Sequence, residues 1–191
     1  MTTTSLDTAK AKKAAINNAL IWALINIILF LLVYYASPTL MGNFAYGIIQ
    51  LAIAIGLAIY FTLDLRTKVG GYWSFREALG SIFLMFIVQV VVVTLFTTTF
   101  AKWIEPSYAD TMREISLNAT TRVAEALSSD QEQIDKMIED AEKNIESQVN
   151  PGFMDVVKGL AIAAIFYFIG ALIFAAIFKR NPPVFAPVEE E

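Results

Sequence analysis

The sequence of 191 residues contains neither cysteine nor histidine, and each absence excludes a kind of chemistry. Without cysteine the chain can form no disulfide bond and can offer no thiolate to a metal ion. Without histidine it lacks the side chain that most often serves as general base, metal ligand or pH switch. The sequence also contains no glycine-rich phosphate loop and no G-x-S-x-G nucleophile motif. We therefore expect a protein that is not an enzyme and has no catalytic, cofactor-binding or metal-binding residues.

Charged residues are scarce as well: they make up 17% of the chain, against about a quarter in ordinary soluble domains. Hydrophobic residues reach 57%, and many of them lie in four runs without a single charge. Each run has the roughly 20 residues that a helix needs to cross a bilayer core about 30 Å thick. The sequence therefore predicts an integral membrane protein. The four runs are residues 16–36, 44–63, 78–101 and 159–178.

The first run allows a second interpretation, a secretory signal, because Tyr35-Ala36-Ser37 offers small residues near a cleavage point. The apolar centre of such signals is about 7–15 residues long, and this run is longer. We therefore favour a first transmembrane helix, preceded by Lys10, Lys12 and Lys13.

The third run has signals at both of its ends. Before it, Ser74 and Glu77 have the Ser-x-x-Glu spacing of a reciprocal N-terminal helix cap. After it come Lys102, Trp103 and Pro106, residue types that are typical of a helix end at a membrane surface.

Basic residues predict the orientation, because cytoplasmic loops of membrane proteins are enriched in lysine and arginine. The turn at residues 37–43 carries no charge, whereas basic residues crowd the helix ends on the opposite side. These are Lys10, Lys12, Lys13, Arg66, Lys68, Arg76, Lys179 and Arg180. Six further basic residues oppose this orientation, but they are spread through or beside a long acidic segment. We expect a multi-pass protein of the bacterial inner membrane with both termini in the cytoplasm.

Residues 105–152 contain eleven acidic and four basic residues, and this segment alone has the character of a soluble protein. Apolar residues recur there at steps of three and four, which predicts two amphipathic helices in a hairpin. Their apolar faces can cover each other, as paired helices usually do, can lie on the top of the helix bundle, or can dock a partner protein. The candidate interaction face consists of Tyr108, Met112, Ile115, Val123, Leu127, Ile134, Ile138 and Ile145.

Uncharged polar side chains inside the predicted spans are the remaining candidates for a functional role. They are Asn17, Asn18 and Asn26 in the first span, Gln50 in the second and Gln89 in the third, with Asn26, Gln50 and Gln89 as the candidate intramembrane polar contacts. Amides in lipid usually form hydrogen bonds between neighbouring helices, and this is the interpretation that we favour. The alternative is that Gln50 and Gln89 line a path for a small solute.

Three stretches of the chain resemble the DUF4199 family, small bacterial four-span membrane proteins of unknown function. The stretches are Gly70-Gly71-Tyr72-Trp73-Ser74-Phe75-Arg76-Glu77-Ala78, Trp103-Ile104-Glu105-Pro106 and Lys179-Arg180-Asn181-Pro182. The resemblance covers nearly the whole chain. It implies a bacterial inner-membrane protein with no established activity, cofactor or catalytic residue, encoded at times near envelope glycosyltransferases.

Together these observations predict an all-α fold: an integral membrane four-helix bundle with an amphipathic helical hairpin inserted between the third and fourth spans. We expect a cytoplasmic tail at residues 1–15, three transmembrane helices within 16–104, an extracytoplasmic acidic hairpin at 105–152, a fourth transmembrane helix at 153–180 and a cytoplasmic tail at 181–191.

The expected function is a non-enzymatic structural or partner-binding component of the inner membrane or envelope. One alternative is a small-solute transporter or channel. Another is an accessory subunit of a lipid-linked envelope glycosyltransferase. The expected partners are membrane lipid, a protein bound through residues 105–152, and a second copy of the chain, with no nucleic acid and no cofactor.

Overall fold

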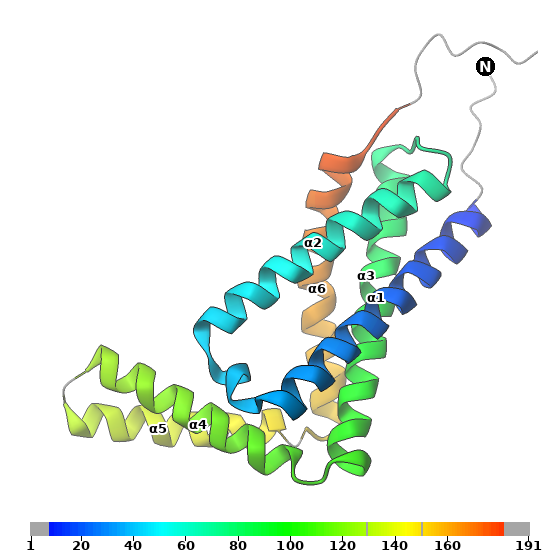
Figure 1. Cartoon of the computed structure of the whole chain (residues 1–191). Coiled ribbons are helices and arrows are strands. Elements are labelled where there is room, and N and C mark those ends of the chain that lie inside the picture. The colour runs from blue at the N-terminus through cyan, green and yellow to red at the C-terminus, as the bar shows by residue number, and fades with distance from the viewer. Residues whose placement is uncertain (1–7, 129, 150, 182–191) are drawn as a thin grey trace, which may run out of the picture. The chain divides into compact units, whose positions relative to one another are not determined.

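The computed structural model describes residues 8–128, 130–149 and 151–181, and nearly all of them are helical (Figure 1). Within these residues the β-type pairing is limited to one isolated bridge, between Trp73 and Arg180. The predicted all-α fold is therefore confirmed. In chain order the elements are α1 (Thr8–Ala36), the 3₁₀ turn η1 (Pro38–Gly42), α2 (Phe44–Lys68), α3 (Phe75–Thr99), the π-helical turn η2 (Phe100–Ile104), α4 (Tyr108–Leu127), α5 (Gln131–Val149) and α6 (Phe153–Phe178).

Four helices of the described chain are long and apolar enough to cross a membrane: α1, α2, α3 with η2, and α6. Large apolar side chains lie exposed along them, for example Ile48, Leu51 and Ile165. A surface of this kind would promote association in water, but lipid solvates it well. The predicted membrane class and its four spans are therefore confirmed.

Two of these helices begin well before the uncharged runs. The helix α1 starts at Thr8, so residues 8–15 form its first two turns rather than a separate tail. Alanine and lysine, which make up most of that segment, are good helix formers. Likewise α6 starts at Phe153, six residues before its uncharged run. Apolar runs locate a span, but helix propensity and capping decide where the helix begins.

The described residues fall into two compact units, each built from parts of the long helices. Of the described residues, the first unit contains 8–24, 55–92 and 162–181, and the second contains 25–54, 93–128, 130–149 and 151–161. Each unit has its own packing and is described separately below.

Aromatic side chains fill the first unit. Trp22 stacks on Phe61, with 5.8 Å between the ring centroids, and meets Phe86 edge-on at 5.6 Å. Fully buried alanines lie on the same helices, among them Ala19 and Ala78. Because lipid tails are as apolar as these side chains, close van der Waals packing, rather than exclusion of water, holds the helices together.

The loop between α2 and α3 also belongs to the first unit, and it closes over the end of α6. Gly70 and Gly71 have positive φ angles of 102° and 83°, a region that glycine enters without strain. They turn the chain so that Trp73, only 1% exposed, donates from Nε1 to the Phe178 carbonyl oxygen at 2.9 Å. The backbones of Trp73 and Arg180 exchange two further hydrogen bonds.

The predicted cap of α3 forms directly after this loop. The Ser74 backbone N–H donates to Glu77 Oε2 at 2.8 Å, and the Glu77 N–H donates to Ser74 Oγ at 3.4 Å. These two bonds are the reciprocal pair of a capping box, so the prediction is confirmed. The sequence repeats the Ser-x-x-Glu spacing at Ser129 and Glu132, and Ser129 lies outside the described residues.

Candidate functional site

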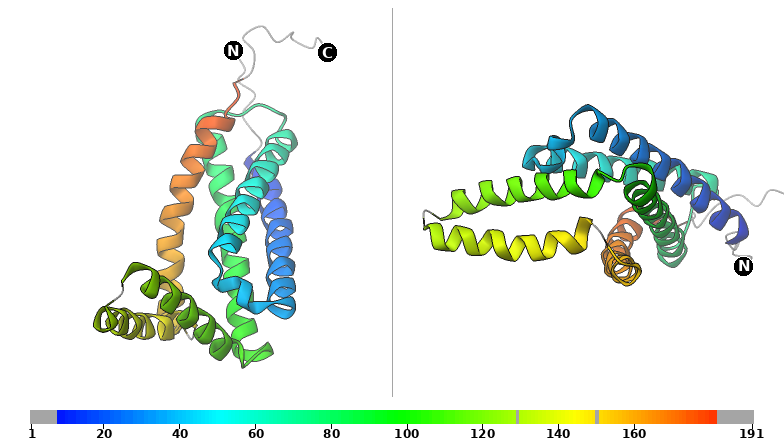
Figure 2. Two further views of the ribbon diagram at one scale, coloured as in Figure 1. Left: turned by 60° about the vertical axis from the view of Figure 1, so that its left-hand side comes forward. Right: turned by 90° about the horizontal axis from the view of Figure 1, so that it is seen from below.

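The acidic segment folds into the predicted hairpin, in the second unit. Helices α4 and α5 lie side by side and run in opposite directions in all views (Figures 1 and 2). Ala124 of α4 is fully buried, and Ile134 and Ile145 of α5 are 7% and 6% exposed. Near the turn, the Asp130 carboxylate accepts a hydrogen bond from the Glu132 N–H at 3.0 Å and caps the start of α5. The two apolar faces therefore cover each other in large part.

The hairpin also packs on η1, the short turn between α1 and α2. Gly42 makes this approach possible, because a Cβ atom there would lie 2.7 Å from Ile115 Cγ2 and 3.2 Å from the Ile115 carbonyl oxygen. Contacts below 3.0 Å are sterically forbidden, so α4 can lie this close only against glycine. The face of α4 that carries Ile115 and Ala119 is thus occupied by the chain itself.

An aromatic hub of six rings anchors the start of the hairpin. Phe100, in the π-helical turn η2, is 1% exposed and lies at its centre. Its ring centroid is 5.4 Å from that of Phe30, 5.3 Å from Tyr34 and 5.8 Å from Tyr108. Phe96 stacks on Phe100 at 6.0 Å, and Tyr35 meets it edge-on at 6.3 Å. Edge-to-face pairs of this kind contribute about 0.5–1.5 kcal/mol each, so α1, α3 and α4 are joined firmly within this unit.

The eight residues of the candidate interaction face have different environments. Six of them are covered to some degree by the rest of the second unit: Ile134 and Ile145 are buried, and Tyr108, Met112, Ile115 and Ile138 are half-buried. The other two are exposed, Val123 by 54% and Leu127 by 73%. Both lie towards the end of α4, beyond Ile115 and Ala119, the two residues that meet Gly42.

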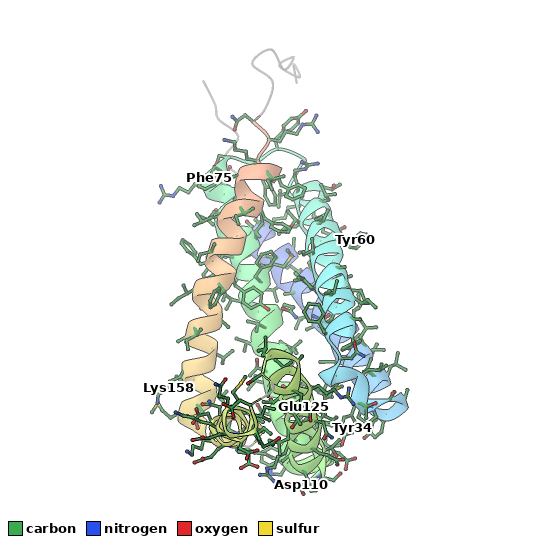
Figure 3. All side chains as sticks on the ribbon, turned by 90° about the vertical axis from the view of Figure 1, so that its left-hand side faces the viewer. Tyr34, Tyr60, Phe75, Asp110, Glu125 and Lys158 are labelled. Carbon is green, nitrogen blue, oxygen red and sulfur yellow. The ribbon has the colours of Figure 1, made fainter. Side chains whose placement is uncertain are left out.

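The outer surface of the hairpin is acidic. Asp110 and Glu125 of α4 are exposed (Figure 3), as are Asp135, Glu139 and Asp140 of α5. A hydrogen bond from Lys143 lowers the pKa of the Glu139 carboxyl, and the same pair raises the pKa of Lys143. Within the described residues no three acidic side chains converge as metal ligands. The acids therefore act as a distributed negative surface.

Burial raises the pKa of the Tyr108 phenol, and the neighbouring Tyr34 adds to the shift. The cause is the aromatic hub, in which a phenolate would be poorly solvated. Tyr108 therefore remains protonated and neutral at physiological pH, as a packing residue of the hub.

The three candidate intramembrane amides differ in burial. Gln89, in the first unit, is 4% exposed. Gln50 and Asn26, in the second unit, are half-buried, and Gln50 Oε1 accepts a hydrogen bond from Tyr46 of its own helix at 3.4 Å. The bond of Gln50 is thus made within α2.

Asn18, another amide of the first span, bonds to the neighbouring helix α2 in a polar network of the first unit, as expected for such groups. Asn18 is fully buried, and its Nδ2 donates to Asp64 Oδ2 at 2.8 Å and to the Phe61 carbonyl oxygen at 3.2 Å. Lys68 Nζ lies 2.6 Å from Asp64 Oδ2 and donates to Asn18 Oδ1 at 2.8 Å. The i, i+4 spacing of Asp64 and Lys68 predicts their ion pair, but no local pattern brings Asn18 to them.

Comparison with known protein families identifies the family of the chain. The family described as a protein of unknown function, DUF4199, matches residues 17–180. The match spans α1 to α6 and includes the hairpin, so these elements belong to one family pattern. No curated protein and no solved structure matches the chain.

Proposed function

Since the chain belongs to the DUF4199 family of proteins of unknown function, we propose its role from its structure: a non-enzymatic component of the bacterial inner membrane whose α4–α5 hairpin binds a partner protein. The exposed pair Val123 and Leu127 carries this proposal. The two side chains lie one turn apart on α4, at positions where the stripe is no longer covered by the chain itself.

A preformed hairpin suits such a role. The aromatic hub, the contact at Gly42 and the burial of Ile134 fix α4 and α5 before any partner arrives. Little conformational entropy is then lost on binding, which favours affinity. The partner would insert apolar side chains beside Val123 and Leu127. Its flanking basic residues would meet the acidic surface, which gives specificity and a fast on-rate.

The orientation is part of the proposal. Lys10, Lys13 and Lys68 lie at one end of the first unit, in α1 and α2. By the positive-inside rule this end faces the cytoplasm, and an odd number of crossings then places the hairpin on the extracytoplasmic side. The partner would accordingly be a membrane protein with an external segment, or an envelope protein.

Site-specific photo-crosslinking in cells tests the proposal. A photoreactive residue at Leu127 is expected to capture a discrete protein partner. The matched control is Glu114, which is exposed on the same helix. It precedes Val123 by nine residues, and at about 100° per residue it therefore lies on the opposite side of α4 from Val123. The control is expected to capture no such partner. Capture of lipid alone from Leu127, or equal capture from both positions, would contradict the proposal.

Two variants extend the test. Deletion of residues 106–150 is expected to abolish co-purification of the partner while leaving membrane insertion intact. Leu127→Asp is expected to weaken co-purification strongly, because an apolar anchor at the centre of an interface commonly contributes 2 kcal/mol or more, or about 30-fold in affinity. If the captured protein is a lipid-linked sugar transferase, the chain would be an accessory subunit of that enzyme.

A further inference from the structure

A small basic cleft opens in the first unit, between the start of α1 and the end of α2. It has a volume of about 230 Å³ and is lined by Lys10, Lys13, Ala14, Asn17 and Lys68. Three of the five lining residues are lysines, and none is acidic. The cleft therefore concentrates positive charge at the point where two membrane-spanning helices end.

The position of one of these lysines is fixed by the polar network. Lys68 is bonded to Asp64 and Asn18, and Asn18 is itself fully buried and bonded to the α2 backbone. Asp64 compensates a single positive charge. Lys13 adds a further positive charge to the cleft, with the amide of Asn17 as a neutral donor and acceptor beside it.

The size of the cleft limits what can bind. Sites for drug-sized ligands and cofactors usually have volumes of about 300–1,000 Å³. At about 230 Å³ the cleft is smaller, and it suits a compact anionic group such as a phosphate ester. Ammonium groups bind phosphate by charge-assisted hydrogen bonds.

The surface next to the cleft favours a lipid as the source of that phosphate. Lys13, Asn17, Leu20 and Leu24 follow one another at steps of four, three and four residues, and so share one face of α1. All four side chains are exposed. The face thus passes from cationic and polar to apolar along the helix, as a headgroup and an acyl chain would require.

We propose that this cleft binds the phosphate headgroup of an anionic phospholipid, whose acyl chain lies along Leu20 and Leu24. The proposal does not depend on the hairpin or its partner. In the proposed orientation the cleft faces the cytoplasmic leaflet, where basic pockets between transmembrane helices bind anionic headgroups. Such a lipid would hold α1 and α2 together at this end.

Native mass spectrometry of the full chain in a neutral detergent tests the proposal. The protein is titrated with dihexanoyl phosphatidylglycerol, with dihexanoyl phosphatidylcholine, and with inorganic phosphate. The decisive variants are Lys13→Gln and Lys12→Gln. Both remove one lysine from the same exposed segment of α1, but the cleft is lined by Lys13 and not by Lys12. Total charge and distance from the membrane surface are therefore matched.

We expect phosphatidylglycerol to bind more tightly than phosphatidylcholine, and Lys13→Gln to weaken its binding about fivefold, the usual effect of one lysine near an anionic lipid surface. Lys12→Gln is expected to leave binding within about twofold. Lys68→Gln should also weaken lipid binding. Because it also breaks the bonds to Asp64 and Asn18, the Lys68→Gln protein can fail to fold, and the comparison of Lys13→Gln with Lys12→Gln then tests the proposal alone. Equal binding of the two lipids, or equal losses in the two variants, would overturn the proposal. Inorganic phosphate binding as tightly as the lipid would overturn the lipid assignment.

Discussion

The close approach of α4 to η1 predicts that Gly42→Ala loosens the hairpin. Gly42 does not have a positive φ angle, so alanine is tolerated by the backbone and only the contact changes. The added Cβ would lie 2.7 Å from Ile115 Cγ2 and 3.2 Å from the Ile115 carbonyl oxygen. Neither atom yields easily, because the β-branched side chain is stiff at χ1 and the carbonyl belongs to a helix.

Overpacking of this kind costs about 1–3 kcal/mol. If α4 opens to relieve it, the opening equilibrium rises by the corresponding factor, about 5- to 150-fold. Hydrogen exchange of the α4 amides in detergent micelles, followed by mass spectrometry, measures this opening directly. We expect faster exchange along α4 and unchanged exchange in the first unit.

Gly47→Ala is the matched control for this substitution. Gly47 lies five residues later, and nothing lies within 4 Å of a Cβ built there. Alanine should stabilise α2 slightly, because glycine is about 1 kcal/mol less favourable in a helix, and α4 exchange should not change. Adding Ile115→Ala to Gly42→Ala removes the shortest contact and should restore part of the protection. Unchanged α4 exchange in Gly42→Ala would refute the described contact.

Three further predictions concern single residues of the two units. Trp73→Ala should lower the free energy of unfolding by about 3–5 kcal/mol, since it empties a buried site and removes the bond to Phe178; thermal unfolding in detergent measures it. Thr62→Val should raise stability by about 1 kcal/mol in the same assay, because Thr62 Oγ1 is buried without a hydrogen-bond partner among the described residues. Tyr108 has a raised pKa, so it favours folding below the ordinary value of 10.0 and loses this effect as pH rises through its folded value. Stability should therefore fall less steeply above pH 10.0 in Tyr108→Phe than in the parent chain, and equal slopes would contradict the burial of this phenol.

Much of the fold follows from local patterns. The four spans are predicted by uncharged runs, and the start of α3 by the spacing of Ser74 and Glu77, because both signals depend only on neighbours in the chain. The hairpin is predicted by its stripe, whose period of three to four residues is that of a helix.

Features made by distant residues were not predictable in this way. Trp73 is a residue type that lies at membrane interfaces, yet it packs against the end of α6, more than a hundred residues later. Phe100 lies within an apolar run, and nothing in that run indicates a π-helical turn at the centre of six rings. Asn18 meets Lys68 across 50 residues. Such contacts depend on how the helices pack, and no pattern among neighbouring residues of the sequence indicates that packing.

The candidate site was predictable in part. The stripe identifies the residues able to cover one another, but it does not say where coverage ends. Gly42 admits α4 against η1 near Ile115, whereas Val123 and Leu127 lie further along α4 and are exposed.

The central claim is a four-span membrane protein whose hairpin lies on the opposite side of the membrane from the loop before α3. Thiol labelling tests it most directly, since the chain contains no cysteine and each introduced cysteine is unique. The two positions are Glu125→Cys in the hairpin and Arg76→Cys at the start of α3, both exposed and separated by a single predicted crossing. With a membrane-impermeant maleimide on intact spheroplasts, Glu125→Cys should be labelled, and Arg76→Cys should be labelled only after lysis. Labelling of both positions in intact spheroplasts, or of Arg76→Cys alone, would contradict the account.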